Sequence, residues 1–339
     1  MRDQIETETA APADGLPKIP VIATGPDFPR ETLEAAEPTA HALLDAATKG
    51  VPRSVLKALD RTSRQWLTRS NNQALSEIDG IARQLDRPGI YFLSVNYEWG
   101  CTTAVKPSPD GQSAVLTRVL DWRTPGLGRH VIAADVRGHS GPFTTLTWPG
   151  YTGILQATAP DRFAGALNQA PMRRGGGGLY PVDWFANRVR VWRSKHDTPG
   201  HLLRRAFETA ETFADARDLL ATTPISTPAI FALVGLKPHE LTIIERTETS
   251  ARILDGPRAT ANIWQSPGWS GRPRGARNAE RICQLAAQTP DITSVPADWL
   301  RPPVLNATTR LAVVANPATD ALAAQGFEAE KPATAALIR

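Results

Sequence analysis

Cysteine is nearly absent from this chain of 339 residues, which contains only Cys101 and Cys283. Two cysteines cannot form the disulfide framework on which small secreted domains depend, so we expect both thiols to be reduced. Any thiol chemistry must therefore use one of these two side chains. For Cys283, which lies in the amphipathic run RICQLAAQ, we predict a small buried hydrophobic residue rather than a reactive one.

Long apolar runs and a secretory signal are also missing. No stretch approaches the roughly 20 apolar residues that span a bilayer, and the N-terminal sequence has neither a basic start nor an apolar core. We therefore expect a cytoplasmic protein without a transmembrane segment. The composition is 41% hydrophobic and 21% charged, which is typical of a globular chain rather than a disordered or fibrous one.

A strong charge imbalance is missing as well. The chain has 38 basic and 34 acidic residues, and the resulting net charge of +4 does not indicate a nucleic-acid partner. The 6 histidines show no metal-like or triad-like grouping, so we expect no metal, no cofactor and no catalytic histidine. The GGGG run at residues 175–178 lacks the Lys and Ser/Thr of a phosphate loop and is interpreted as an ordinary loop.

The predicted secondary structure changes from helical to extended near Cys101. Residues 1–24 lack periodic apolar residues and are predicted to be a flexible tail. Apolar spacing then predicts helices over residues 33–48, 54–67 and 75–85. From Cys101 onward, a hairpin of residues 101–105 and 113–122 is predicted around the turn cluster PSPDGQ. The composition of residues 90–97 leaves helix and strand open.

The pattern beyond the hairpin is that of an antiparallel meander followed by helices and further strands. The expected strands cover residues 130–136, 142–148, 151–155, 163–168, 229–236, 241–246, 250–254, 260–264 and 310–315. The expected helices cover residues 182–195, 201–222 and 276–287. Strands, helices and strands in separate blocks imply segregated layers, so we predict an α+β fold.

Cys101 differs from Cys283 in its surroundings. It follows Gly100 directly and opens a predicted strand, and Arg118 and Asp121 come 17 and 20 residues later, across the hairpin. If the strands pair, both charged residues can lie beside the thiol. A neighbouring cation lowers the pKa of a thiol and produces thiolate, the reactive nucleophile. An ordinary cross-strand salt bridge explains the same two residues without catalysis.

The segment IDGIARQLDRPGIYFLSVNYEWGCTTAV, with TRVLDW after it, resembles the acid ceramidase and N-acylethanolamine-hydrolysing acid amidase family. That family has a Tyr-Glu pair before its cleavage-site Cys, then Cys-Thr, then Arg-x-x-Asp-aromatic. The matching residues here are Tyr97, Glu98, Cys101, Thr102, Arg118, Asp121 and Trp122. The resemblance continues through WPGYTGIL, PAIFALVG and ATANIW, and covers about residues 25–315.

The family consists of N-terminal-nucleophile hydrolases, which resemble choloylglycine hydrolases in fold. The resemblance implies a four-layer αββα sandwich and self-cleavage between Gly100 and Cys101. A helical α chain of residues 25–100 is then expected to stay bound to a catalytic β chain of residues 101–339. It also implies a helix over residues 90–97, and it places Glu98, Trp122 and Trp148 beside the substrate.

The resemblance also implies the roles of the site residues. Cys101 becomes the nucleophile, with its freed α-amine as the general base. Asp121 is expected to orient that amine, and Arg118 to tune the site. Asn168 in FAGALNQAP and Asn262 in ATANIW match positions that stabilise the oxyanion.

A second family arginine follows the latter asparagine by a little over a dozen residues. The interval SPGWSGRPRGARNAER offers Arg272, Arg274, Arg277 and Arg281. We select Arg277, because it stands six residues before Cys283 as the family pattern suggests. The loop length differs from the family pattern, and so does the spacing of Glu98 from Cys101, which is shorter than in the animal lipid amidases.

The expected activity is hydrolysis of a linear N-acyl amide, such as a lipid amide, through an acyl-thioester on Cys101. Two alternatives stay open. Isopenicillin N acyltransferase-like proteins share Gly-Cys-Thr-Thr at their cleavage point and pass the acyl group to an amine, although the pair Arg118 and Asp121 fits the amidases better. An uncleaved binding protein on the same fold is the other alternative.

Overall fold

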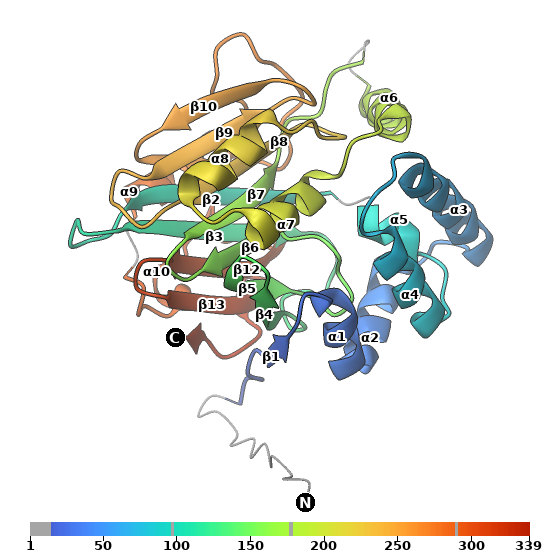
Figure 1. The fold of residues 1–339 in the computed structure, drawn as a ribbon, viewed down its shortest axis with the longest axis horizontal. Helices are drawn as coiled ribbons and strands as arrows, with labels where there is room; N and C mark the ends of the chain where they lie inside the picture. Colours follow the sequence, from blue (N-terminus) through green and yellow to red (C-terminus); the bar gives the residue numbers. More distant parts are fainter. Residues whose placement is uncertain (1–14, 96–97, 176–178, 289–290) are drawn as a thin grey trace, which may run out of the picture.

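Two stacked β-sheets form the centre of the molecule (Figure 1), in a computed structural model that describes residues 15–95, 98–175, 179–288 and 291–339. Within these residues the first sheet has eight strands, in the order β1-β4-β5-β6-β7-β8-β9-β10. They are β1 (Val21–Thr24), β4 (Ile132–Gly138), β5 (Gly141–Thr147), β6 (Gln156–Ala159), β7 (Phe163–Gln169), β8 (Ala229–Val234), β9 (Leu241–Arg246) and β10 (Ala251–Asp255).

The second sheet follows the order β11-β2-β3-β12-β13-β14, and β15 also pairs with β13. Its strands are β11 (Arg258–Thr260), β2 (Trp99–Pro107), β3 (Ala114–Trp122), β12 (Thr309–Asn316), β13 (Ala321–Glu328), β14 (Lys331–Pro332) and β15 (Leu337–Ile338). The predicted hairpin of residues 101–122 is therefore confirmed, but it belongs to this second sheet rather than to one continuous meander.

The helices fall into three groups. The N-terminal group is α1 (Phe28–Ala35), α2 (Glu37–Thr48), α3 (Arg53–Arg69), α4 (Leu75–Leu85) and α5 (Ile90–Val95). The middle group is α6 (Tyr180–Arg193), α7 (Pro199–Thr209) and α8 (Phe213–Thr222), and the last is α9 (Asn278–Ala287) and α10 (Pro296–Trp299). The N-terminal group lies to one side of the sheets, with α6 next to α3 (Figure 1).

The layers follow from which element each sheet face contacts. Helices α7 and α8 pack on β7 to β10, whereas α9 and α10 pack on the second sheet, and β2 and β3 face β7 and β8 between them. Every residue of β8, AIFALV, is buried, as expected for a strand covered on both faces. The predicted α+β fold is confirmed, and its layers are stacked in the order helix, sheet, sheet, helix.

Several boundaries differ from the sequence prediction. Residues 21–24 of the predicted flexible tail form β1, which pairs in parallel with β4 at the sheet edge, while residues 1–14 lie outside the described residues. Of these four residues only Thr24 is buried, so they carry no periodic apolar signal, and their partner strand lies more than 100 residues away. The extended run at 151–155 is a loop before β6, and β13 had not been anticipated.

The expected helix over residues 201–222 is two helices. Thr212 caps α8, because its hydroxyl accepts from the N–H of Asp215 and the Asp215 carboxylate accepts from the N–H of Thr212. This capping box starts a new helix where apolar spacing alone continues the old one. Residues 90–95 form α5, so the helix implied by the family resemblance is confirmed there, and residues 96–97 lie outside the described part.

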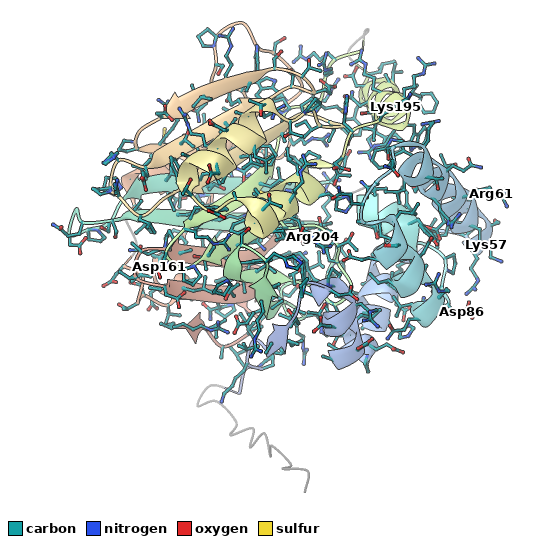
Figure 2. All side chains as sticks on the ribbon, viewed as in Figure 1. Lys57, Arg61, Asp86, Asp161, Lys195 and Arg204 are labelled. Atoms are coloured by element: carbon teal, nitrogen blue, oxygen red, sulfur yellow. The ribbon has the colours of Figure 1, made fainter. Side chains whose placement is uncertain are left out.

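Polar contacts fix the N-terminal helices to the rest of the molecule. Arg204 of α7 lies between the two parts (Figure 2), where its Nη2 donates to Glu77 at 2.8 Å and its guanidinium lies 4.8 Å from the ring centroid of Phe28. Asn72 donates to Asp197 at 2.9 Å. These contacts join residues before position 100 to residues after it.

His201 is the most strongly perturbed histidine of this interface. Its ring nitrogens lie 3.3 Å from Asn72 Nδ2 and 3.1 Å from Thr152 Oγ1. Burial, helped by the charge of Arg204, lowers the pKa of His201 to about 3. The ring therefore stays neutral in the folded protein at pH values where an unfolded chain would protonate it.

Because of this shift in the pKa of His201, the free energy of unfolding falls as the pH is lowered. Between an unfolded pKa of about 6.5 and the folded value, only the unfolded chain binds the proton, so the unfolding free energy drops by about 1.4 kcal/mol per pH unit. We expect wild type to lose about 2 kcal/mol more than His201→Gln between pH 7 and pH 5 in urea unfolding. His239→Gln, at an exposed position, is the control and should keep the wild-type slope. Equal slopes in wild type and His201→Gln would contradict the assignment.

Candidate active site

The hairpin of β2 and β3 positions the candidate nucleophile. Its register pairs Cys101 with Leu120, Thr103 with Arg118, and Gly100 with Asp121. Because side chains alternate along a strand, Cys101 and Arg118 share the face that meets the other sheet. Asp121 points to the opposite face, so the expected placement of both charged residues beside the thiol holds for Arg118 alone.

The thiol of Cys101 is completely buried, at 0% exposure. Arg118 Nη2 donates to the sulfur at 3.0 Å and to the carbonyl of Leu167 at 2.8 Å, and Nη1 donates to the carbonyl of Leu155. Two main-chain carbonyls thus hold the guanidinium against the sulfur.

The pKa of Cys101 does not shift in the direction expected from its sequence context. Burial raises the pKa of the thiol and outweighs the opposing effect of Arg118, while Asp121 adds to the increase. The prediction of a lowered pKa is therefore wrong for the uncut chain. Removing the sulfur from water disfavours its charged form more than one cation favours it.

The backbone nitrogen of Cys101 has a defined partner. It donates to Asn262 Oδ1 at 2.8 Å, while Asn262 Nδ2 donates to the carbonyl of Gln169 at 2.7 Å and its own N–H donates to Asn278 Oδ1 at 3.1 Å. Asp121, which we had expected to orient this nitrogen, makes no hydrogen bond to it among the described residues. Asn262 holds that position.

Asn168 lies on β7, across the sheet interface from the hairpin. Its Oδ1 accepts from Thr103 Oγ1 at 2.8 Å, and its Nδ2 lies 3.4 Å from the carbonyl of Ala261. The structure therefore brings both predicted asparagines to β2, the strand that carries Cys101. In the uncut chain both amide groups are already engaged by protein atoms.

Asp121 forms a buried cluster on the outer face of the hairpin. Its carboxylate pairs with Arg281 of α9, and it accepts from Asn306 Nδ2 at 3.0 Å and Thr309 Oγ1 at 2.9 Å. The side chains of Arg281 and Asp121 are only 3% and 5% exposed. Burial raises the pKa of Asp121, and Arg281 with the two neutral donors opposes that effect.

Arg277, which the sequence analysis selected, lies outside this cluster. Its side chain is 57% exposed and pairs with Glu280, and its backbone has a left-handed φ of 52° at the residue before α9. Arg281 is the arginine that contacts Asp121 instead. The helix had been predicted from residue 276, but α9 starts at Asn278, so Arg277 lies before its first turn.

An apolar cavity of about 290 Å³ lies between the N-terminal helices and the strand ends. Trp122 and Trp148 line it, with their ring centroids 5.7 Å apart in an edge arrangement, and Ile90 and Leu93 of α5 lie on the other wall. Trp122 also stacks on Trp99, with the ring centroids 5.3 Å apart. The cavity therefore adjoins the start of β2.

A larger cleft of about 960 Å³ lies over Gly100 and the pair of Asp121 and Arg281. Glu98 lines both this cleft and the apolar cavity. A Cβ at position 100 would lie 3.5 Å from the nearest atoms of Asp121, an ordinary contact, so packing does not require glycine at the predicted cleavage site.

Glu98 is held by donors from later parts of the chain. Its carboxylate accepts from Tyr180 Oη at 3.0 Å and lies 3.1 Å from Arg274 Nη1 and 3.7 Å from Arg188 Nη2. Burial alone would raise the pKa of Glu98, but the two arginines and the tyrosine bring it below its usual value. Sequence reasoning missed both Arg188 and Tyr180, which reach the site from α6. Tyr97, the other half of the predicted motif, lies outside the described residues.

Neither a metal site nor a membrane-spanning helix is found in the described residues. No group of three or more His, Cys, Asp or Glu side chains in that part of the chain could hold a metal ion. No helix in the same residues is both long and apolar enough to cross a membrane.

Curated proteins similar to this chain are amidases and ceramidases. The N-acylethanolamine-hydrolyzing acid amidase of Caenorhabditis elegans is 26% identical over 168 residues, 49% of this chain and 44% of that protein. The Oryctolagus cuniculus amidase of the same name is 27% identical over 175 residues, 51% of this chain and 43% of that protein. A probable acid ceramidase of Caenorhabditis elegans is 25% identical over 221 residues, 57% of this chain and 52% of that protein. The chain thus spans about half the length of the curated relatives it matches.

No family model matches the chain. Among solved structures, the Caenorhabditis elegans N-acylethanolamine-hydrolyzing acid amidase ortholog gives a TM-score of 0.45 at 19% identity, covering 64% of this chain and 93% of that one. A mutant of the conjugated bile acid hydrolase from Clostridium perfringens gives 0.41 at 8% identity, covering 70% and 92%. In sequence, the chain is therefore similar to N-acylethanolamine-hydrolyzing acid amidases and acid ceramidases over about half of its length.

Proposed function

We propose that this protein is a self-processing cysteine amidohydrolase that acts on linear N-acyl amides. The observation that supports this most is the immediate surroundings of Cys101. Its sulfur lies 3.0 Å from Arg118 Nη2, and its backbone nitrogen lies 2.8 Å from Asn262 Oδ1. One residue thus has both its nucleophilic atom and its future amine held by buried polar groups.

Self-cleavage begins with attack of the Cys101 sulfur on the carbonyl carbon of Gly100. The C–N bond breaks, the Cys101 nitrogen takes up the proton lost by the thiol to become an α-amine, and Gly100 is left as a thioester. Water then hydrolyses the thioester, giving a Gly100 carboxylate and regenerating the thiol. Asn262 is placed to hold the departing nitrogen during this shift.

Cleavage matters because the thiol is inaccessible in the uncut chain. Cys101 has no exposed surface, and Trp99 and Gly100 continue β2 directly before it. In this proposal the segment of residues 98–100 moves aside after cleavage and opens the sulfur to substrate. Access then depends on processing.

Catalysis by the processed protein uses the new terminus. The α-amine of Cys101 takes the thiol proton, Arg118 stabilises the thiolate, and the sulfur attacks the substrate carbonyl. The amide donors of Asn168 and Asn262 are the candidates for stabilising the oxyanion. The amine product leaves with the proton, and water releases the acyl group as an acid.

The apolar cavity supports an acyl chain as one part of the substrate. Its walls carry Trp122, Trp148, Ile90 and Leu93, side chains that favour a hydrocarbon over a polar group. The names of the curated relatives, which concern N-acylethanolamines and ceramide, point to the same substrate class.

We further propose that the two chains stay associated after cleavage. β1 belongs to the first 100 residues but pairs with β4, and Arg204 binds Glu77 across the same boundary. Main-chain pairing and a partly buried ion pair both survive the loss of one peptide bond. The cytoplasmic location expected from the N-terminal sequence stays a prediction.

The first test is processing itself. Purified protein should separate into fragments of residues 1–100 and 101–339 under denaturing conditions, and Cys101→Ala should remain one chain. Cys283→Ala is the matched control. That cysteine is exposed, not buried as the sequence predicted, and its loss should leave cleavage unchanged. Intact mass and N-terminal sequencing give the answer. A single wild-type chain, or fragments that persist in Cys101→Ala, would remove the mechanism.

The second test compares two arginines. Arg281→Gln leaves the Asp121 carboxylate buried without its counter-charge, so we expect a loss of roughly 3 kcal/mol in unfolding free energy and slower self-cleavage. Arg277→Gln breaks an exposed pair and should change stability by no more than about 0.5 kcal/mol. Urea unfolding and the time course of fragment formation measure both. Equal effects of the two substitutions would place Asp121 and Arg281 outside the site.

The third test identifies the acyl acceptor. Processed protein supplied with N-lauroylethanolamine should release lauric acid at the same rate whether or not a second amine is added, since water is the proposed acceptor. Mass spectrometry distinguishes the acid from a new amide, and Cys101→Ala provides the blank. A new amide as the main product would identify an acyltransferase. An uncleaved chain without turnover would favour a binding protein on the same fold.

A further inference from the structure

The carboxylate of Glu98 occupies a site built from two arginines and a tyrosine. Arg188 and Tyr180 both come from α6, whereas Arg274 comes from the loop before α9. The side chains of Arg188 and Arg274 are only 11% and 16% exposed. Two mostly buried cations from separate elements thus converge on one anion, the Glu98 carboxylate, whose side chain is 33% exposed.

The two arginines are held by contacts other than Glu98. Arg274 Nε donates to the carbonyl of Ala170 at 3.1 Å, and the Arg188 guanidinium lies 5.5 Å from the ring centroid of Trp184. These supports stay in place when Glu98 leaves. The site is therefore largely preorganised for an anion.

Glu98 satisfies this site incompletely. Its Oε1 makes no hydrogen bond of good geometry among the described residues, although it lies near both arginines. Arg188 Nη2 is 3.7 Å away, beyond the length of a hydrogen bond. The Glu98 side chain is restrained because its backbone directly precedes β2. A carboxylate on a separate molecule is free to move between the two guanidinium groups and could bind both more closely.

Glu98 also lies on the segment that moves in the proposed function, three residues before Cys101. Its departure would remove the carboxylate that the two mostly buried guanidinium groups share. Losing the anionic partner of a buried cation is strongly unfavourable, so the opened site would attract a replacement anion. The position is at the junction of the apolar cavity and the cleft, because Glu98 lines both.

The cleft itself favours anions. Five arginines line it, Arg123, Arg272, Arg274, Arg277 and Arg281, against three carboxylates. The carboxylates are Glu98, Asp121 and Glu330. Once Glu98 leaves, the excess of positive charge on the walls increases, and such a cleft concentrates negatively charged ligands.

We propose that Arg188, Arg274 and Tyr180 form a carboxylate subsite, which Glu98 fills in the uncut chain and an N-acyl amino acid fills in the processed enzyme. This inference rests on the proposed amidase function. The acyl chain occupies the apolar cavity, and the carboxylate on the amine side of the amide reaches the subsite. Water adds across the amide bond, so the products are a fatty acid and a free amino acid.

Two substrates of nearly equal size test the proposal. Processed wild type should hydrolyse N-lauroylglycine with a kcat/KM at least tenfold above that of N-lauroylethanolamine, which replaces the carboxylate by a hydroxymethyl group. Charged hydrogen bonds of this kind carry roughly ten- to hundredfold in binding. Arg274→Gln and Arg188→Gln should each lower the glycine-to-ethanolamine ratio by about tenfold. Arg217→Gln, which breaks an exposed pair with Asp255, is the control and should keep the ratio.

The outcomes distinguish a failure of the carboxylate subsite from a failure of the proposed amidase function. A wild-type ratio of one or less overturns the carboxylate subsite, even where a variant fails to fold. In that case, Cys101-dependent hydrolysis of the ethanolamide still supports the amidase. If a processed chain hydrolyses neither compound, both proposals fail. A stronger preference for N-lauroyltaurine than for N-lauroylglycine would overturn the choice of a carboxylate over a sulfonate.

Discussion

The register between β2 and β3 is the constraint on which the rest of the site depends. Pairing Cys101 with Leu120 places the thiol and Arg118 between the sheets and leaves Asp121 facing α9. A slip of one residue would exchange these faces, since side chains alternate along a strand. Buried apolar residues on both faces resist such a slip, and the stacked pair of Trp99 and Trp122 closes one end of the hairpin.

Arg118 occupies an unusual electrostatic environment. It is 0% exposed, its hydrogen-bond acceptors are two carbonyls and the sulfur, and no carboxylate pairs with it within the described residues. A thiolate at Cys101, whose sulfur accepts from Arg118, would supply the missing negative charge. Burial holds the pKa of Cys101 up in the uncut chain. Admission of water would weaken that effect and leave the cation as the dominant influence on the sulfur.

The predictable parts of the structure were those encoded by local pattern. A Pro-Asp-Gly turn between two apolar runs gave the hairpin of β2 and β3, and the family resemblance resolved residues 90–95 as a helix where composition alone did not. The same resemblance led to Asn168 and Asn262, both of which the structure brings to the strands around Cys101.

The unpredictable parts depended on burial and on distant partners. Arg277 was selected by its spacing from Cys283, but its side chain is exposed before α9, whereas Arg281 is buried against Asp121. The sign of the thiol pKa shift required knowing how deeply Cys101 is buried, which spacing along the chain does not reveal. Arg188 and Tyr180 reach Glu98 from α6, more than 80 residues away in the sequence, and no sequence motif predicts these contacts.

The short strand β1 has a consequence for solubility. It covers the outer edge of β4, where Val21 to Thr24 align with Ala133 to Val136. A bare strand edge offers a row of unpaired N–H and C=O groups to any other chain, which is a common route to aggregation. These four residues of the N-terminal segment therefore protect the edge of the sheet. Removing them would expose the unpaired N–H and C=O groups of β4 to other chains.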